Sequence, residues 1–136
     1  MNDEKVQEKY LIFQLLQQNL EALKQNQELV KKQLDEILMT AGVLRELGRI
    51  GKEEEIMIPL GGGCFGTGKI TDNKNVTVDI GAGIMLSKDV ESTISFLGAR
   101  EKELEDASRH LIEEMNKIAN KMNELGSEIQ SMAGES

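Results

Sequence analysis

A glycine-rich stretch is the part of the chain whose spacing comes nearest to a reactive site. Residues Gly63 to Lys69 match the first part of a phosphate-binding P-loop, G-x-x-x-x-G-K. The next residue is Ile70, where a P-loop needs Ser or Thr, and Asp72-Asn73 predicts a turn instead of the required helix. We therefore favour glycines that shape a hairpin. A small nucleotide-binding protein stays open as an alternative that titration with ATP and Mg²⁺ tests.

The other reactive side chains have no partners at useful spacing. Gly81-Ala82-Gly83 lacks the third glycine of a dinucleotide fingerprint, and Cys64 is the single cysteine. His110 has neither a second histidine nor a cysteine at ligand spacing, and Glu53-Glu54-Glu55 is typical of a solvated loop. No Ser/His/Asp or Cys/His group converges. The sequence predicts no catalytic residues, no metal, no cofactor and no enzyme.

Composition favours extended helices over a compact core. The chain has 136 residues, of which 3% are aromatic, 39% hydrophobic and 29% charged, without tryptophan. A net charge of −8 with no basic patch argues against nucleic-acid binding. No apolar run approaches the roughly 20 residues of a membrane span, and the N-terminus lacks a signal-peptide pattern. We expect a cytoplasmic protein that does not enter membranes.

A heptad repeat predicts one continuous helix from about Asn2 to Leu47. The segment has no proline, and Gly48 and Gly51 favour its end. The expected seam, apolar except at Lys9 and Gln27, is Val6, Lys9, Phe13, Leu16, Leu20, Leu23, Gln27, Val30, Leu34, Ile37, Ala41 and Leu44.

A second heptad helix is predicted from near Asp89, a suitable N-cap. On its flanks, Glu105 with Arg109 and Glu113 with Lys117 are expected i,i+4 ion pairs. Its seam is Val90, Ile94, Leu97, Glu101, Leu104, Ser108, Leu111, Met115, Ile118, Met122, Leu125, Ile129 and Met132.

The two helices match in length, which indicates an antiparallel hairpin of helices. The register that we predict places polar Gln27 one layer from polar Ser108. Its facing pairs are Leu44 with Ile94, Leu34 with Leu104, Leu20 with Ile118, Leu16 with Met122, and Phe13 with Leu125.

Between the helices, short apolar and β-branched runs alternate with turn-forming clusters. Residues 56–60, 65–71, 75–80 and 84–87 are predicted strands, separated by glycines at 61–63 and 81–83 and by Asp72-Asn73-Lys74. Two small hairpins are marginal alone, so their apolar faces and open edges need partner chains. The expected interface is Ile56, Ile58, Leu60, Phe65, Ile70, Val76, Val78, Ile80, Ile84 and Leu86.

This layout resembles the prefoldin family, and its two hairpins resemble the alpha type. The residues that carry the resemblance are Ile56 to Gly63, Gly68-Lys69-Ile70, Val78 to Gly83 and Ile94 to Leu97. The implied fold is α+β: a long antiparallel two-helix coiled coil joined by two small β-hairpins that oligomerise into a β-barrel. Its parts are a coiled-coil helix at 1–50, an oligomerisation segment at 51–87 and a second coiled-coil helix at 88–136.

The resemblance also implies a function. It implies an ATP-independent holdase in which two alpha-type and four beta-type subunits form a hexamer. Unfolded client proteins would be held at the coiled-coil tips and passed to a group II chaperonin. The alternative is a coiled-coil structural protein that assembles with itself, even into filaments.

The sequence at the tip supports binding of apolar chains. Leu11 and Leu15 lie off the seam and one turn apart on the outward face, and methionine suits surfaces that accept many partners. The plainer alternative is that the leucines contact a neighbouring subunit and the methionines are core. The expected client-binding set is Val6, Tyr10, Leu11, Ile12, Phe13, Leu15, Leu16, Met122, Leu125, Ile129 and Met132.

Overall fold

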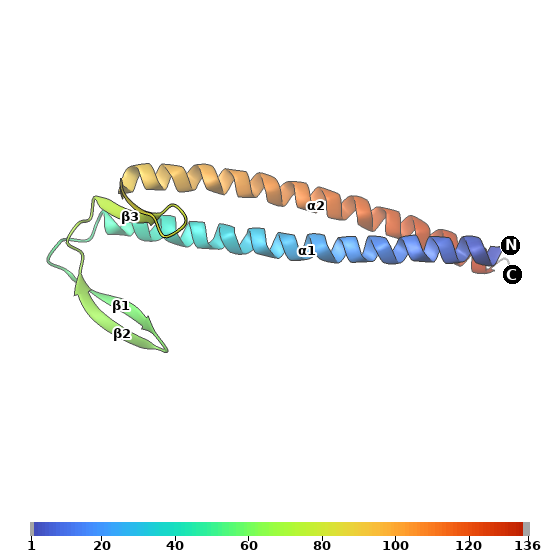
Figure 1. Cartoon of the computed structure of the whole chain (residues 1–136), viewed down its shortest axis with the longest axis horizontal. Coiled ribbons are helices and arrows are strands. Elements are labelled where there is room, and N and C mark those ends of the chain that lie inside the picture. Colours follow the sequence, from blue (N-terminus) through green and yellow to red (C-terminus); the bar gives the residue numbers. More distant parts are fainter. Residues whose placement is uncertain (1, 135–136) are drawn as a thin grey trace. The chain divides into compact units, whose positions relative to one another are not determined.

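The computed structural model describes residues 2–134 as two long helices separated by two β-hairpins (Figure 1). The elements are helix α1 (Asn2–Leu47), strands β1 (Glu55–Gly61), β2 (Cys64–Lys69), β3 (Asn75–Asp79) and β4 (Met85–Asp89), and helix α2 (Val90–Gly134). The strands form two separate antiparallel sheets, β1 with β2 and β3 with β4. The predicted combination of long helices and small hairpins is confirmed.

The chain divides into two compact units, which we describe separately. The terminal unit comprises the chain up to Leu34 and from Glu103 onward, and the central unit comprises Asp35–Lys102. The terminal unit is therefore purely helical, whereas the central unit contains both hairpins and the helix ends that flank them.

In the terminal unit, the first part of α1 lies antiparallel beside the last part of α2 (Figure 1). Every predicted seam residue of α1 from Val6 to Leu34 is half-buried, and the residues between them are exposed. The predicted seam of α2 from Leu104 to Met132 is likewise buried or half-buried. Each helix is covered on one side only, which is why most of the seam is half-buried and not enclosed.

Two polar contacts across this seam agree with the predicted register. The Gln27 side-chain amide donates a 2.7 Å hydrogen bond to the Ser108 hydroxyl. Lys9 Nζ lies 2.6 Å from Glu128 Oε2, and Glu128 is adjacent to Ile129, which the register places opposite Lys9. A heptad slip of either helix would separate both pairs, so the polar seam residues help to specify the alignment.

The flanking ion pairs differ from the predicted ones. Arg109 pairs with Asp106 at 3.1 Å and Lys117 pairs with Glu114 at 3.6 Å, in place of the expected partners four residues away. Both observed pairs have i,i+3 spacing, which brings side chains together on a helix as readily as i,i+4 spacing does.

Local hydrogen bonds fix the junction between the second hairpin and α2. Asp89 is the N-cap, as predicted: its Oδ2 accepts a 3.1 Å hydrogen bond from the backbone N–H of Ser92. Hydrogen bonds from the Ser92 side chain and backbone hold the pKa of the Asp89 carboxyl below its ordinary value. The N–H of Val90 donates to the carbonyl of Lys74 at 2.7 Å, which ties the start of α2 to the loop before β3.

The hairpins follow the predicted strands with small shifts. In the first, Glu55 pairs with Lys69 and Ile58 with Gly66, and the register is irregular between Pro59 and Gly61. In the second, Asn75 pairs with Asp89. Ile80, predicted at the end of a strand, follows β3 and closes the turn by donating to the Ile84 carbonyl at 3.0 Å.

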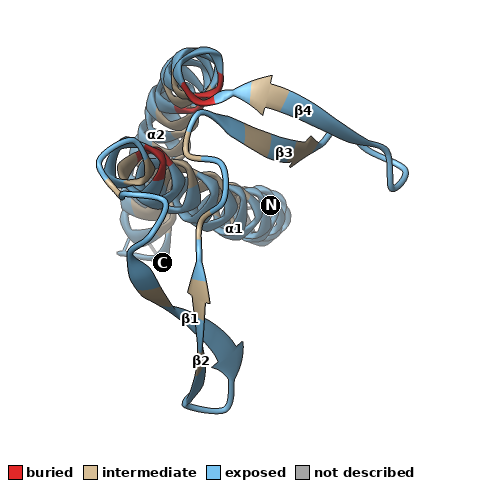
Figure 2. Cartoon of the chain, turned by 90° about the vertical axis from the view of Figure 1, so that its left-hand side faces the viewer, coloured by how far each residue is buried: buried red, intermediate tan, exposed pale blue. Residues whose placement is uncertain are grey.

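The hairpins contribute nothing to the core. In the central unit, the buried residues are Ala41 and Leu44 of α1 and Val90 and Thr93 of α2. Residues 55–89 are all exposed or half-buried, as the pale blue and tan strands of Figure 2 show. Two-stranded sheets without a covered face are marginal in water.

Candidate polypeptide-binding and assembly surfaces

An outward-facing apolar patch lies near the start of α1, in the terminal unit. Tyr10, Leu11, Ile12 and Leu15 are 54%, 60%, 48% and 60% exposed, and we call these four residues the tip patch. Residues 11 and 15 share a face because they are one helical turn apart. Beside the patch, Val6, Gln7, Tyr10 and Leu11 line a shallow hollow of about 300 Å³. The patch offers apolar surface to an extended or helical peptide.

The remaining predicted client-binding residues belong to the seam. They are half-buried between the two helices, although Val6 and Leu16 also line shallow depressions: Val6, Phe13, Leu16, Met122, Leu125, Ile129 and Met132. The structure thus divides the predicted set into four exposed residues and seven seam residues. Without movement of the helices, the tip patch is the most exposed part of the predicted set.

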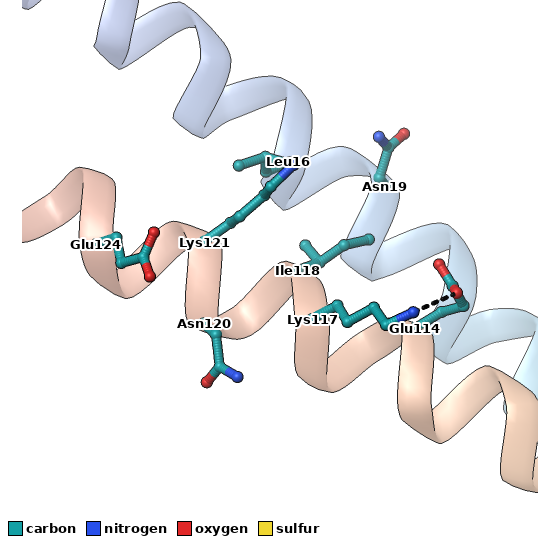
Figure 3. A pocket seen from close by; sticks show the side chains of 8 residues that line it. All are labelled: Leu16, Asn19, Glu114, Lys117, Ile118, Asn120, Lys121 and Glu124. Carbon is teal, nitrogen blue, oxygen red and sulfur yellow. Dashed lines mark ion pairs between the residues drawn. The ribbon is translucent and has the colours of Figure 1, made fainter.

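A shallow pocket of about 470 Å³ lies further along the terminal unit (Figure 3). Leu16 of α1 and Ile118 of α2 provide its apolar part. Its rim carries charges of both signs and amides, and the Lys117–Glu114 ion pair belongs to it: Asn19, Glu114, Lys117, Asn120, Lys121 and Glu124. Lys117 is 75% exposed and paired with Glu114, so we regard the pocket as a solvated depression on the flank of the coiled coil.

The first hairpin presents an apolar face whose flatness depends on glycine. Gly68 faces Ile58, whose Cδ1 lies 2.6 Å from the position that a Cβ at residue 68 would occupy. Leu60 similarly lies over Gly66, at 3.6 Å from its equivalent position. Phe65 pairs with Pro59 and lies on the opposite face, because side chains alternate along a strand. The predicted assembly residues of this hairpin therefore occupy two faces.

The second hairpin has a simpler arrangement. Val78 pairs with Leu86 and Val76 with Lys88, so these side chains share one face. Leu86, Ile80 and Ile84 are exposed, and Val76 and Val78 are half-buried. The Lys88 ammonium lies 4.8 Å from the centre of the Phe96 ring, within the range of a cation–π contact. The second hairpin therefore has a partly exposed apolar face that carries one charged residue, Lys88, near the start of α2.

The sequence interpretation missed an apolar groove of about 560 Å³ in the central unit. Off-seam Met39 and Val43 of α1 are strongly exposed there, and Ile56 and Ile70 reach it from the first hairpin. The available signal was the i,i+4 spacing of two apolar residues outside the heptad seam. The full lining is Met39, Gly42, Val43, Glu46, Leu47, Ile50, Ile56 and Ile70.

The glycine-rich segment forms a hairpin, and the phosphate-loop alternative is wrong. Gly61, Gly62 and Gly63 have positive φ angles of 103°, 60° and 79° and make the turn between β1 and β2. A bend and β3 follow Lys69, where a P-loop needs a helix. Lys69 Nζ lies 3.4 Å from Glu53 Oε2.

Other reactive groups remain apart in the structure. Cys64 is a free, exposed thiol. Within residues 2–134, no three His, Cys, Asp or Glu side chains are grouped as metal ligands. Neither α1 nor α2 is apolar enough over a sufficient length to cross a membrane.

Comparison with known proteins places this arrangement in a family. The prefoldin subunit family model matches residues 16–135. The prefoldin subunit alpha of Methanococcus aeolicus is 30% identical over 99% of this chain and 94% of its own length. That of Pyrococcus horikoshii is 35% identical over 70% of this chain, and the match spans 65% of its length, just under two thirds.

The fold has a solved counterpart. A filamentous PFD of Methanocaldococcus jannaschii, determined by cryo-electron microscopy, has a TM-score of 0.71 with this chain, covering 90% of this chain and 98% of its own. At 16% identity the likeness concerns the fold alone. Together with the family match and the alpha-subunit relatives, the helix–hairpins–helix order shows that this chain belongs to the prefoldin family of non-enzymatic chaperone subunits, and its expected kinship with the alpha type is confirmed.

Proposed function

We propose that the chain is a holdase subunit that binds unfolded polypeptides through the tip of its coiled coil, in the cytoplasm and without nucleotide hydrolysis. The observation that carries the proposal is the tip patch, where four neighbouring apolar side chains of a solvated helix are about half exposed or more. Contiguous exposed apolar surface marks binding sites in soluble proteins. Unfolded chains supply the complementary apolar segments.

The proposed binding is weak at each tip. Burying one leucine-sized side chain contributes about 1.5 to 3 kcal/mol before the ordering costs of binding are subtracted. Leu11 and Leu15 therefore cannot hold a mobile chain alone. Several tips in one assembly would act together and raise the effective concentration of the next contact. The function we propose thus needs assembly.

We further propose that the hairpins provide that assembly, with two alpha-type and four beta-type subunits joined through β-barrels. Support comes from the hairpins themselves, since residues 55–89 contain no buried side chain and Leu86 leaves an apolar face open. The filamentous neighbour is 16% identical and carries no argument for filaments of this chain. Held clients would pass to a group II chaperonin.

Client binding is tested by removing the outward leucines. Leu11→Ser with Leu15→Ser should abolish the suppression of aggregation of guanidine-denatured citrate synthase, followed by light scattering. A matched control replaces two similarly exposed leucines of α1 outside the patch, Leu29→Ser with Leu38→Ser. Unchanged suppression by the tip variant, or equal loss in both variants, would refute the tip as the binding site.

Assembly is tested separately by native mass. The native mass of the chain alone should differ from that of the chain co-expressed with a beta-type subunit. A hexamer should form only in the co-expressed sample. Sizing chromatography with light scattering measures both. A large homo-oligomer formed by the chain alone would favour self-assembly and contradict the mixed hexamer.

A further inference from the structure

A charged residue occupies the seam close to the tip. Lys9 lies at a seam position of the terminal unit, where two-stranded coiled coils favour apolar side chains. Its ammonium lies 2.6 Å from Glu128 Oε2 on the opposite helix. The other predicted seam positions of the terminal unit carry no charge. The pair is thus an ionic link between the two helices of this unit, close to their ends.

The pair divides the seam residues of the tip. Val6, Ile129 and Met132 lie between it and the ends of the helices, and each is half-buried. Phe13 and Leu125 follow on the other side. Tyr10, a member of the tip patch, is adjacent to Lys9 in the chain. Contact between the helix ends therefore decides whether the outermost apolar seam residues are covered.

We propose that the Lys9–Glu128 pair is a reversible clasp that closes the coiled-coil tip, and that its opening adds Val6, Ile129 and Met132 to the surface that holds clients. This inference rests on the proposed function and adds its regulation. Opening enlarges the apolar surface beyond the four residues of the tip patch.

The exposure of the pair makes it suited to opening. The Lys9 and Glu128 side chains are 32% and 51% exposed, so solvent and salt screen their attraction. An ion pair of this kind changes an equilibrium by a factor of about 2 to 5. An apolar residue at position 9 would instead bury itself in the seam and hold the ends together. The lysine thus keeps the tip closed by an interaction that a competing client can replace.

Distance measurements test the clasp directly. Spin labels at Val6→Cys and Met132→Cys, with Cys64→Ser in all variants, report the separation of the helix ends in the full chain. From about 0.1 M to about 1 M NaCl the Debye length falls from about 10 Å to about 3 Å. The open, long-distance population should rise about 2- to 5-fold in the native sequence. Lys9→Leu should remain closed at both salt concentrations.

Charge reversal supplies the matched control. Glu128→Lys should open the tip by repulsion, and Lys9→Glu combined with Glu128→Lys should close it again, because the swap restores opposite charges. The Lys69–Glu53 pair of the central unit is a more exposed ion pair outside the tip. Lys69→Gln should leave the distances unchanged. A tip that is equally closed in Glu128→Lys and in the native sequence would overturn the proposal.

A disulfide across the clasp tests its effect on holding. Oxidised Val6→Cys/Met132→Cys should suppress aggregation of denatured citrate synthase less than the reduced form, and reduction should restore the activity. The control disulfide joins Leu20→Cys and Ile118→Cys, which face each other in the seam further from the helix ends than the Lys9–Glu128 pair. Its oxidation should leave the suppression of aggregation unchanged. Equal activity of the oxidised and reduced tip variants would overturn the clasp as a regulator.

These outcomes are distinguishable from failure of the proposed function. If Leu11→Ser with Leu15→Ser leaves holding unchanged, the tip patch is not the client site, whatever the spin labels report. If that variant loses holding while the locked tip keeps it, the patch acts alone and the clasp inference fails by itself.

Discussion

The Gln27 side-chain amide reaches across the seam and donates a 2.7 Å hydrogen bond to the Ser108 hydroxyl. The Gln27 carbonyl oxygen, Oε1, is buried and has no hydrogen-bond partner within the described residues. An unsatisfied buried acceptor costs stability, whereas a polar seam pair restricts the helices to one alignment. The Gln27–Ser108 contact therefore fixes the alignment of the two helices but lowers the free energy of unfolding.

Replacing the polar layer should separate these two effects. Gln27→Leu with Ser108→Leu should raise the free energy of unfolding by about 1 to 3 kcal/mol, because it removes the unsatisfied acceptor and adds apolar contact. Thermal unfolding followed by circular dichroism measures the change. The same variant should form more of a slipped crosslink between Leu20→Cys and Leu125→Cys. A less stable double variant would contradict the assigned cost of the layer.

Asp89 should make the start of α2 sensitive to acid. Its folded pKa lies below the ordinary value of 3.8, chiefly through hydrogen bonds from Ser92, so its contribution is complete above that value and is lost as the pH falls through the lower folded pKa. The protection of the Ser92 amide against hydrogen exchange, relative to the intrinsic exchange rate at each pH, should therefore fall below about pH 4. In Asp89→Asn the cap persists without titrating, and its exchange should lack this step. An identical acid step in both proteins would assign it to another group.

Gly98 is a position in α2 where replacement by alanine should stabilise the helix. A Cβ added there meets no atom within 4 Å, and the residue is in a helix interior. Gly98→Ala should raise the free energy of unfolding by about 0.5 to 1 kcal/mol, because alanine loses less backbone entropy on folding. Gly81→Ala is the contrasting control, since the φ of Gly81 is 115° and alanine should destabilise that turn. Loss of assembly or stability in Gly98→Ala would indicate that a partner chain packs against residue 98.

The open face of the second hairpin should be required for assembly. Leu86→Lys places a charge on the face shared with Val78 and should shift the native mass toward smaller species while leaving helix content unchanged. Met85→Lys is the matched control, because Met85 is similarly exposed, adjacent in sequence and on the opposite face. Sizing chromatography measures both. Dissociation by Met85→Lys alone would show that the interface uses the other face.

Regular, short-range features of the structure were predictable from the sequence. The heptad spacing identified the half-buried seam residues from Val6 to Leu34, since helical geometry alone determines which side chains share a face. Asp89 marked the start of α2, and the glycines at 61–63 marked a turn, because caps and positive φ angles depend on a few neighbouring residues. The outward positions of Leu11 and Leu15 followed from the same heptads.

Features that depend on particular side-chain positions were not predictable. The sequence did not distinguish Asp106 from Glu105 as the partner of Arg109, because both spacings are compatible with a helix. It assigned Phe65 and Ile58 to one assembly interface but not to particular faces, and strand pairing places them on opposite faces. It also missed the groove at Met39 and Val43, since Ile56 and Ile70 reach it only when the first hairpin folds.

By itself, the sequence determined the two helices, their seam and the existence of the hairpins, because each depends on repeats and turn residues that act over a few positions. The predicted register already placed Gln27 one layer from Ser108, but only the tertiary structure decided that their side chains form a hydrogen bond. It also decided that Lys9 pairs with Glu128 and that the hairpins bury none of their own residues. These outcomes join residues far apart in the chain. They depend on which side chains lie within contact distance in the folded backbone, and a local sequence pattern does not determine this.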